Sequence, residues 1–178
     1  MTGQAPDFHL IIPDGDDKER SVCRSCGFID YVNPKLVAGV VATDSAGRIL
    51  MCKRAIEPRH GFWTLPAGFM EKGESVEDGA AREAREEACA ELELEGLPAV
   101  YSVPRISQVQ MFFRARLISD IAAGPESLDV ALYEWEDIPM SDLAFPTVRW
   151  ALEDFRASMD LTVPTPVMRT QGPNFEPL

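Results

Sequence analysis

The sequence predicts one α/β domain with a mixed β-sheet, preceded by a short N-terminal appendage that carries a Cys-x-x-Cys pair. Apolar runs rich in β-branched residues alternate with turn residues, as core strands do, and two segments have the composition of helices. The chain has 178 residues, 46% of them hydrophobic, which is enough for one domain with its own core. We therefore expect an appendage at residues 1–34, a main domain at residues 35–160 and a proline-rich tail at residues 161–178.

The first half of the main domain is expected to form a hairpin, a loop and a helix. Residues 36–43 (LVAGVVAT) and 49–54 (ILMCKR) are apolar runs joined by a Ser-Ala-Gly turn, which predicts a hairpin in the core sheet. Residues 57–73 contain five glycines or prolines and should form a structured loop. A helix is predicted over residues 75–89, because Ser75 can cap it and alanines and charged residues follow.

The second half continues with strands and a second helix. Strands are predicted at residues 92–103, 108–117 and 128–135. A second helix is expected over residues 141–158, where Pro146 must lie near the start or interrupt the helix. The last twenty residues contain four prolines and predict an extended tail.

The charge of the chain excludes some classes of partner. Acidic residues outnumber basic ones by 29 to 17, and the net charge of −12 argues against a protein that binds nucleic acid or a membrane surface through basic side chains. No run of 18 apolar residues is present, and the first residues do not resemble a signal peptide. We therefore expect a cytoplasmic protein with no nucleic-acid and no membrane partner.

The negative charge is concentrated around the first predicted helix. Residues 71–95 contain ten carboxylates and three basic residues, which is 3 − 10 = −7 of the total. A solvated helix with pairs such as Arg82 with Glu86 would explain part of this. However, Glu83, Glu86 and Glu87 share one helix face, where like charges repel unless a positive group lies among them. Carboxylates on adjacent turns suit Mg²⁺ or Mn²⁺.

At these residues the sequence resembles the Nudix hydrolase family. The family motif places a glycine, a glutamate and an Arg-Glu-apolar-x-Glu-Glu-x-Gly-apolar run at fixed spacing. This chain has Gly68, then Glu74, then Arg82-Glu83-Ala84-Arg85-Glu86-Glu87-Ala88-Cys89-Ala90. Every charged position of the motif is filled, and Cys89 replaces the second glycine. The resemblance implies the Nudix fold, in which a mixed β-sheet is sandwiched between α-helices.

The resemblance also implies an activity and roles for these residues. Members of the family hydrolyse a nucleoside diphosphate linked to another moiety, and they use Mg²⁺ or Mn²⁺. The implied metal ligands are Glu83, Glu86 and Glu87, helped by the backbone carbonyl of Ala67 or Gly68. Glu74 and Arg82 would form a structural ion pair. The general base would be Glu83 or a carboxylate of a later loop, for which Glu126 and Asp129 are candidates alongside the alternative of surface acids.

Further similarity concerns a subgroup of the family whose N-terminus carries a zinc ribbon. It rests on Tyr31-x-Asn33-Pro34-Lys35, on residues 52–55 and 61–70, and on residues 124–127. The subgroup includes enzymes that cleave ADP-ribose and FAD with release of AMP, and homodimers are common. Arg54 and Arg59 are candidates for gripping phosphates. Trp63 is the first candidate for stacking on a base, with Phe62, Phe69 and Tyr101 as alternatives, although core packing competes for each aromatic.

The N-terminal cysteines form only half of a zinc site. Cys23 and Cys26 are spaced as one zinc knuckle, and neither Cys52 nor Cys89 resembles the second half. Three outcomes remain: no metal, a site completed across a dimer, or a pair upstream of this chain start. We favour the absence of a stable intrachain Zn²⁺. Two other functions also stay open, a nucleotide sensor without turnover and an interaction module built on the ribbon.

Overall fold

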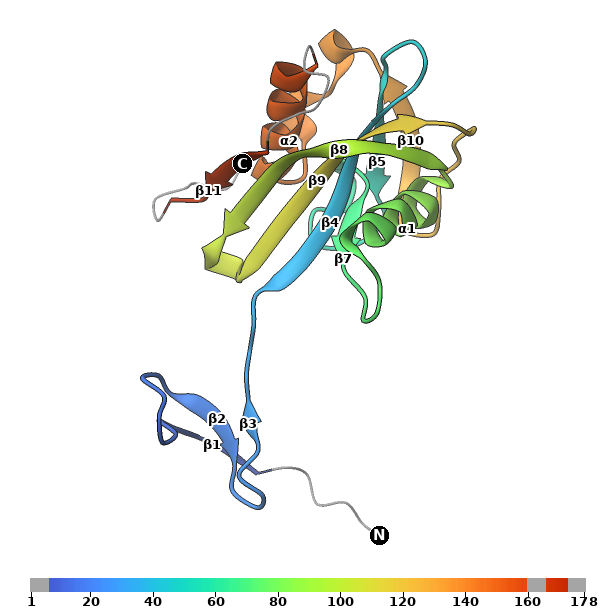
Figure 1. Cartoon of the computed structure of the whole chain (residues 1–178). Helices are drawn as coiled ribbons and strands as arrows, with labels where there is room; N and C mark the ends of the chain where they lie inside the picture. Colours follow the sequence, from blue (N-terminus) through green and yellow to red (C-terminus); the bar gives the residue numbers. More distant parts are fainter. Residues whose placement is uncertain (1–6, 160–165, 173–178) are drawn as a thin grey trace. The chain divides into compact units, whose positions relative to one another are not determined.

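The computed structural model describes residues 7–159 and 166–172, and its chain divides into two compact units, residues 1–34 and 35–178 (Figure 1). Each unit has its own β-sheet. Neither described helix has the length and apolar composition that crossing a lipid bilayer would require.

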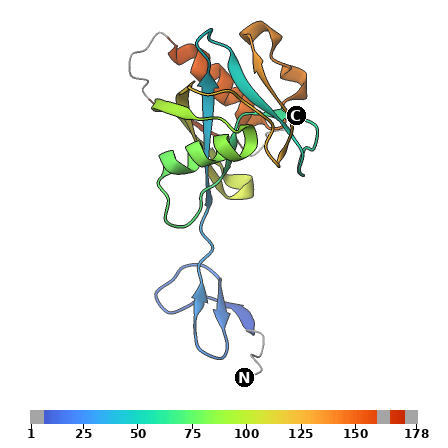
Figure 2. The ribbon, with the colours of Figure 1, turned by 90° about the vertical axis from the view of Figure 1, so that its right-hand side faces the viewer.

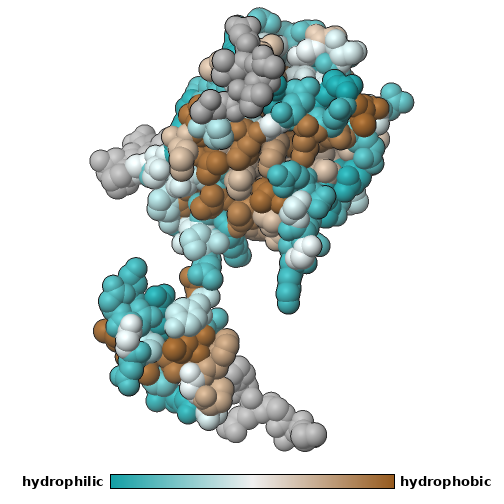
Figure 3. All heavy atoms as spheres, in the orientation of Figure 1, coloured by the Kyte–Doolittle hydropathy of each residue, from teal (hydrophilic) through white to brown (hydrophobic). Residues whose placement is uncertain are grey.

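The N-terminal unit contains a small antiparallel sheet. Its strands are β1 (Phe8–Ile11), β2 (Arg20–Cys23) and β3 (Ile29–Asp30), in the order β1-β2-β3. Several of its large apolar side chains are exposed, and Figure 3 shows this unit with hydrophobic residues at its surface; Leu10, Phe28 and Val32 are 67%, 60% and 79% exposed. Only Val22 and Cys23 are buried among the described hydrophobic residues of this unit, so its core is very small.

The main unit is built on a mixed sheet, as predicted. The path of strands is β10-β5-β4-β9-β8-β11, with β6 paired to β5 and β7 paired to β4. The bounds are β4 Lys35–Thr43, β5 Ile49–Arg54, β6 Trp63–Thr64, β7 Ala67–Phe69, β8 Leu92–Val103, β9 Gln108–Leu117, β10 Ser127–Tyr133 and β11 Val167–Thr170. The pairs β4–β9 and β8–β11 are parallel and the others are antiparallel.

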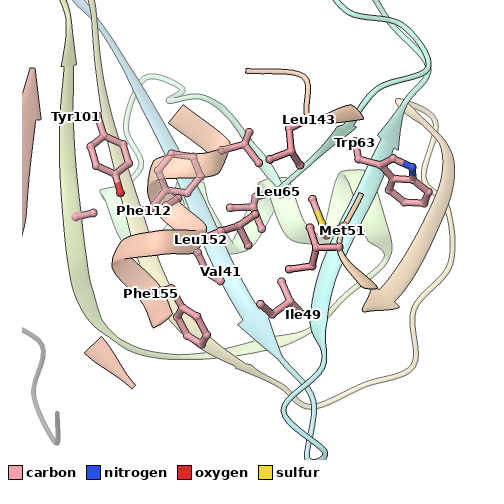
Figure 4. Close-up of a cluster of buried hydrophobic side chains, with 14 residues drawn as sticks. Val41, Ile49, Met51, Trp63, Leu65, Tyr101, Phe112, Leu143, Leu152 and Phe155 are labelled. Carbon is pink, nitrogen blue, oxygen red and sulfur yellow. The ribbon is translucent and has the colours of Figure 1, made fainter. Parts of the chain in front are cut away.

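The two helices, α1 (Val76–Ala88) and α2 (Pro146–Ser158), cover opposite faces of this sheet (Figure 2). Alternate residues of a strand point to opposite faces, so Val40 and Phe113 pack with the alanines of α1, whereas Val41 and Phe112 pack with α2. Figure 4 shows the α2-side cluster, in which Leu152 and the other labelled side chains fill the space between helix and sheet. The predicted sandwich of a mixed sheet between helices is therefore confirmed.

Helix α1 has the limits that its sequence predicts. The Ser75 hydroxyl accepts a hydrogen bond from the Asp78 backbone N–H at 3.1 Å, which caps the N-terminus. At the other end Cys89 has φ 50° and ψ 27°, and its N–H donates to the carbonyls of Ala84 and Arg85. Cys89 therefore occupies the left-handed position that ends many helices and that glycine adopts most easily.

Two expectations for the C-terminal part differ from the structure. Helix α2 begins at Pro146 rather than residue 141, and residues 140–142 form a separate 3₁₀ turn. Proline lacks an N–H and favours the first helical position, so it starts the helix instead of interrupting it. Residues 167–170, expected in an extended tail, form β11 beside β8. Three prolines of the expected tail (Pro164, Pro173 and Pro177) lie outside the described residues.

Shorter 3₁₀ segments complete the main unit. They are η1 (Pro104–Ile106), which turns β8 into β9, η2 (Trp135–Asp137) and η3 (Met140–Asp142), which lead into α2. The loop before α1 carries β6 and β7, which confirms the expectation of an ordered loop over residues 57–73.

Candidate functional site

A cavity of about 760 Å³ in the main unit brings together the loop before α1, the polar face of α1 and the start of α2. Among the sequence-predicted site residues, those that line it are Arg54, Arg59, Ala67, Gly68, Phe69, Arg82, Glu83, Glu86, Glu87 and Glu126. The sheet positions this cavity, since β7 pairs with β4 and so holds Gly68 beside the sheet. Residues separated by more than 70 positions in the sequence therefore face one space.

Close approach between β7 and α1 defines the centre of the site. A Cβ atom built on Gly68 would lie 2.3–2.4 Å from the Glu83 carboxyl group, so only glycine leaves room for this carboxylate. The Ala67 N–H donates to Glu87 Oε2 at 3.3 Å. Glu83 and Glu87 are only 8% and 5% exposed. Two glutamates of one helix are thus held against the backbone of β7, away from bulk water.

Arg82 connects the loop to the helix. Its guanidinium donates two hydrogen bonds to the Glu74 carboxylate, at 2.9 and 3.0 Å, and one to the Phe69 carbonyl at 3.0 Å. Its Nη1 also donates to Glu83 and Glu86, both at 2.8 Å. The hydrogen bonds from Arg82 lower the pKa of Glu74 to about 2. The sequence-predicted pair of Glu74 with Arg82 is present, and Arg82 is the positive group among the crowded carboxylates.

Burial makes the charged form of the inner carboxylates costly. Desolvation raises the pKa of Glu87 to about 8, and the nearby charge of Glu83 adds to the effect. The pKa of Glu83 is also raised, again mainly by burial, although its hydrogen bond with Arg82 opposes the shift. Buried carboxylates that repel one another favour a positively charged ligand between them.

Glu126 reaches the same cavity from the loop before β10. Gly124 makes this possible: its N–H donates to the Glu87 carbonyl at 3.0 Å, and an added Cβ would lie 1.7 Å from the Glu86 carbonyl oxygen. Glu126 lines the same cavity as Glu83 and Glu87, and its charge adds to the rise in the pKa of both. Asp129, the other loop candidate, lies in β10 and is not among the residues that line the cavity.

Two arginines lie beside these acids. Arg54 is at the end of β5, where its Nε donates to the Pro58 carbonyl at 2.8 Å and its guanidinium lies 5.2 Å from the centre of the Phe145 ring. Its charge also acts on Glu87. Arg59 lines the cavity as well, and its guanidinium lies 5.1 Å from the Phe62 ring centre. The cavity therefore combines carboxylates with guanidinium groups that suit phosphate oxygens.

The structure corrects the aromatic candidates. Trp63 does not line the cavity, because it is 8% exposed and packs edge-on against Tyr133 with ring centres 5.2 Å apart. Tyr101 is fully buried and donates a hydrogen bond to Asp154 at 2.8 Å. Phe62 does not line the cavity, whereas Phe69 does. Core packing explains Trp63 and Tyr101, since their large apolar rings belong to the cluster beneath α2.

Several lining residues were missed at the sequence level. They include Arg105, Gln108, Gln110, Phe145, Trp150 and Gln171. Gln108, Gln110 and Phe112 alternate along β9 and therefore share a sheet face, which is a signal that the sequence contains. Phe145, Trp150 and Gln171 enter the cavity through tertiary packing, and no local pattern marks them.

Glu83, Glu86, Glu87 and Glu126 form what we call the acidic end of the cavity. Its donor chemistry suits a divalent cation. Carboxylate oxygens and the carbonyls of β7 are the hard ligands that Mg²⁺ and Mn²⁺ take. In the described part of the chain, no three acidic, histidine or cysteine side chains are grouped as around a bound ion. Arg82 donates hydrogen bonds to Oε1 of Glu83 and Oε2 of Glu86, and each carboxylate has a second oxygen that can act as a ligand.

The N-terminal unit does not fit a four-ligand zinc site. Cys23 is buried and Cys26 is exposed in a turn where the Gly27 N–H donates to the Cys23 carbonyl at 2.9 Å. Within the residues that the structure describes, no third histidine, cysteine or acidic side chain completes a metal group with them. Cys52 is buried in β5 and Cys89 ends α1, so both lie in the other unit. Two thiolates rarely hold Zn²⁺.

Comparison with known proteins identifies relatives of both units. The family described as the NUDIX domain matches residues 33–154, and the family described as Nudix N-terminal matches residues 5–32. A solved NUDIX hydrolase from Nitrosomonas europaea is 40% identical, with a TM-score of 0.86 over 96% of this chain and 98% of that chain.

Two curated relatives carry more specific names. An ADP-ribose pyrophosphatase from Methanocaldococcus jannaschii is 30% identical over 115 residues, which are 61% of this chain and 67% of the relative. A NAD-capped RNA hydrolase NudC from Stutzerimonas stutzeri is 27% identical over 148 residues, which are 82% of this chain and 52% of the relative. The chain therefore spans about half to two thirds of these curated relatives.

Proposed function

The chain belongs to the NUDIX family and is a Nudix hydrolase, and on this premise we propose that it cleaves the pyrophosphate bond of a nucleoside diphosphate linked to another moiety. The favoured substrates are ADP-ribose and FAD, with AMP as one product. The observation that carries the proposal is the pair of buried carboxylates, Glu83 and Glu87, pressed against β7 at one end of a cavity that also contains arginines.

The reaction is difficult because the substrate and the attacking water-derived oxygen both carry negative charge. Glu83, Glu86 and Glu87, with the carbonyl of Gly68, would hold Mg²⁺ or Mn²⁺. When bound, the cation neutralises phosphate charge and lowers the pKa of coordinated water. The chain's own residues provide the rest: Arg54 and Arg59 bind phosphate oxygens, and Arg82 fixes the loop against the helix.

A proton must leave the attacking water. We assign this step to Glu126, because it approaches the acidic end from another element than α1 and acts electrostatically on Glu83 and Glu87. Glu83 is the alternative, although its carboxylate accepts a hydrogen bond from Arg82. For ADP-ribose, one P–O bond of the pyrophosphate breaks and one P–O bond to the water oxygen forms, which yields AMP and ribose 5-phosphate.

The substrate panel that tests this proposal consists of ADP-ribose, FAD, NADH and a short NAD-capped RNA, each with Mg²⁺, Mn²⁺ or EDTA. We expect AMP from ADP-ribose or FAD with metal and no product in EDTA. Mass analysis in ¹⁸O-labelled water then shows which phosphorus the water oxygen attacks. Preferred turnover of the capped RNA would contradict both the substrate assignment and the expectation of a protein without nucleic-acid partners.

Matched variants test the residues. Glu86→Gln and Glu87→Gln should each reduce kcat by at least about 100-fold, as loss of a transition-state charge contact does. Glu77→Gln is the control, because Glu77 is exposed in the first turn of the same helix and does not line the cavity. Full activity of the Glu86 and Glu87 variants would overturn the metal assignment. Binding of ADP-ribose without any turnover would instead support the sensor function.

A cytoplasmic homodimer is also part of the proposal. It rests on the resemblance to the Nudix family. Light scattering of the purified chain tests the dimer directly, and a monomer at micromolar concentration would contradict it.

A further inference from the structure

The N-terminal unit, residues 1–34, has very little core to stabilise it. Among its described hydrophobic residues, only Val22 and Cys23 are buried. Units of fewer than about 40 residues usually need a disulfide, a metal ion or a partner chain in addition to their core. The side chains of this unit do not fit a four-ligand zinc site, which leaves a disulfide or a partner chain.

Sulfur and imidazole groups occur in this unit only at Cys23, Cys26 and His9. The register of the sheet separates the histidine from the first cysteine. His9 lies opposite Val22, and Phe8 lies opposite Cys23. Because neighbouring residues of a strand point to opposite faces, His9 faces away from Cys23. The described residues accordingly place no third sulfur, imidazole or acidic group with the two thiols.

A tight turn holds the two cysteines close together. The Gly27 N–H donates to the Cys23 carbonyl at 2.9 Å, and the Cys23 N–H donates to the Phe28 carbonyl at 2.8 Å. Gly27 has φ 73°, a left-handed conformation that glycine adopts without steric cost. Cα atoms three residues apart in a turn lie within about 7 Å, and disulfides span Cα distances of about 4.4–6.8 Å. The backbone therefore holds the pair at a separation that a disulfide can bridge.

The two thiols also interact directly. Hydrogen bonds from the backbone N–H groups of Cys26 and Ser25, and from the Cys26 side chain, lower the pKa of the Cys23 thiol. The thiolate is the form that attacks a disulfide bond. Cys23 is buried, whereas Cys26 is exposed. One sulfur is thus accessible to a reagent, and the other lies beside it as a nucleophile.

We propose that Cys23 and Cys26 form a redox modification site, which a low-molecular-weight disulfide such as oxidised glutathione converts reversibly into an intrachain disulfide that stabilises the N-terminal unit. Cys26 first attacks the reagent, so that its sulfur joins one glutathione while the glutathione S–S bond breaks and the other glutathione leaves. Cys23 then attacks the Cys26 sulfur, which closes the protein disulfide and releases the second glutathione. The two cysteine protons pass to the two glutathione thiolates, and the protein loses the two electrons that the reagent gains.

The remaining cysteines act as internal references. Cys52 is buried in β5, and desolvation raises the pKa of its thiol well above the usual value, so it should stay reduced. Cys89 is exposed at the end of α1, where glutathione can reach it and form a mixed disulfide. The modification proposed for the N-terminal unit does not depend on the reaction proposed for the main unit.

The test titrates the full reduced chain with oxidised glutathione, blocks the free thiols and digests the chain with trypsin. Arg24 lies between the two cysteines, so trypsin separates Cys23 in residues 21–24 from Cys26 in residues 25–35 unless a disulfide joins the two peptides. We expect half of the chains to carry the joined peptides at a reagent concentration at least about tenfold lower than the one that modifies half of Cys89, because the second step is intramolecular. Dithiothreitol should restore the separate peptides.

Matched variants identify each sulfur. Cys23→Ser removes the second nucleophile and should accumulate a mixed disulfide on Cys26, whereas Cys89→Ser should leave the Cys23–Cys26 disulfide unchanged. Wild-type peptides that stay separate at concentrations that modify Cys89 would overturn the proposal. Binding of one Zn²⁺ per two chains through both thiolates, measured by metal analysis of the purified chain, would overturn it as well.

The stabilising effect is measured on the wild-type chain alone. Chymotrypsin under native conditions should cut within residues 7–34 about tenfold more slowly in the oxidised chain than in the reduced chain, because the disulfide restricts the unfolded state of the unit. Cleavage within the main unit of the same samples is the control and should not change. Equal cleavage of the N-terminal unit in both forms would contradict the stabilising role.

Discussion

Two glycines, Gly68 and Gly124, determine how closely the neighbouring segments can approach α1 at the acidic end. At Gly68 a Cβ would collide with the end of the Glu83 side chain, whereas at Gly124 it would collide with the backbone carbonyl of Glu86. A carboxyl group can turn away at small cost, but a helix backbone cannot. An added methyl group is therefore expected to affect activity at Gly68 and stability at Gly124.

We predict that Gly68→Ala folds normally but loses activity. The added methyl group displaces the Glu83 carboxylate, and a shift of about 1 Å in a catalytic group can cost about 100-fold in kcat/KM. Steady-state kinetics and a thermal melt of the same preparation measure both properties. Gly124→Ala provides the contrast, with a free energy of unfolding reduced by about 1–3 kcal/mol because the backbone must move. Equal activity in Gly68→Ala and wild type would contradict the close-approach argument.

Cys89 is the one departure from the family motif, and its backbone makes it a target for stabilisation. A residue with a Cβ at φ 50° pays a steric cost that glycine avoids. Cys89→Gly should therefore raise the free energy of unfolding by about 0.5–1 kcal/mol in urea denaturation. Cys89→Ala is the control for loss of the thiol and should show no such gain. A glycine variant no more stable than the alanine variant would show that this backbone position is unstrained.

At the scale of the element, the buried carboxylate on the acidic face of α1 lowers the stability of the folded protein. Glu87 is buried, and its pKa of about 8 lies above the value near 4.5 of an unfolded glutamate. The folded protein therefore holds a proton that the unfolded chain releases, and this group's contribution to stability falls as the pH rises from about 4.5 to 8. Such trade-offs are typical of functional sites.

Replacing this carboxylate should reveal the trade-off. In EDTA, Glu87→Gln should be about 1–2 kcal/mol more stable than wild type at pH 8, and the difference should shrink toward pH 5. Urea unfolding at both pH values measures the effect, and Glu77→Gln on the exposed side of α1 serves as control. A variant less stable than wild type at pH 8 would mean that the charged Glu87 stabilises the metal-free fold.

The sequence predicts elements well where the signal is local. Ser75, the alanines and the following charges define α1 almost to the residue, and the motif identifies Gly68, Arg82 and the glutamates that line one cavity. Local patterns are a poor guide where tertiary packing determines the location of a side chain. Trp63 was expected to stack on a base, but it packs in the core.

Long-range pairing is the part that no local pattern reveals. β11 pairs with β8 across about 70 residues of sequence, and proline-rich flanking segments suggest a tail rather than a strand. Gln171 follows this strand, so its place in the cavity depends on a pairing that cannot be recognised from adjacent residues. The fold of the main unit could thus be predicted more fully than its cavity.

At the scale of the whole molecule, the location of the negative charge is more informative than the net value of −12. Seven of the excess charges lie in residues 71–95, where α1 and its flanks surround the acidic end of the cavity. A bound divalent cation relieves this repulsion, whereas monovalent salt only screens it. The acidic composition therefore agrees with the proposed function, in which a cation lies between these carboxylates and the phosphates of the substrate.

Divalent cations should consequently stabilise the folded protein more than a monovalent salt of equal ionic strength does. Millimolar MgCl₂ is expected to raise the Tm by about 3–6 °C over NaCl of equal ionic strength, since ligand binding to the folded state shifts unfolding. Differential scanning fluorimetry measures the shift, and Glu83→Gln combined with Glu87→Gln should abolish it. Identical melting in the two salts would contradict a cation site in the folded protein.

The position of β11 has a consequence for the order in which the site forms. During synthesis the strands from β4 to β10 and both helices leave the ribosome before residues 167–171, so a nascent chain can assemble the acidic end while the part of the cavity that Gln171 lines is still incomplete. That part of the cavity is completed last, when β11 pairs with β8. Removal of β11 is therefore expected to alter the cavity before it disrupts the other strands of the sheet.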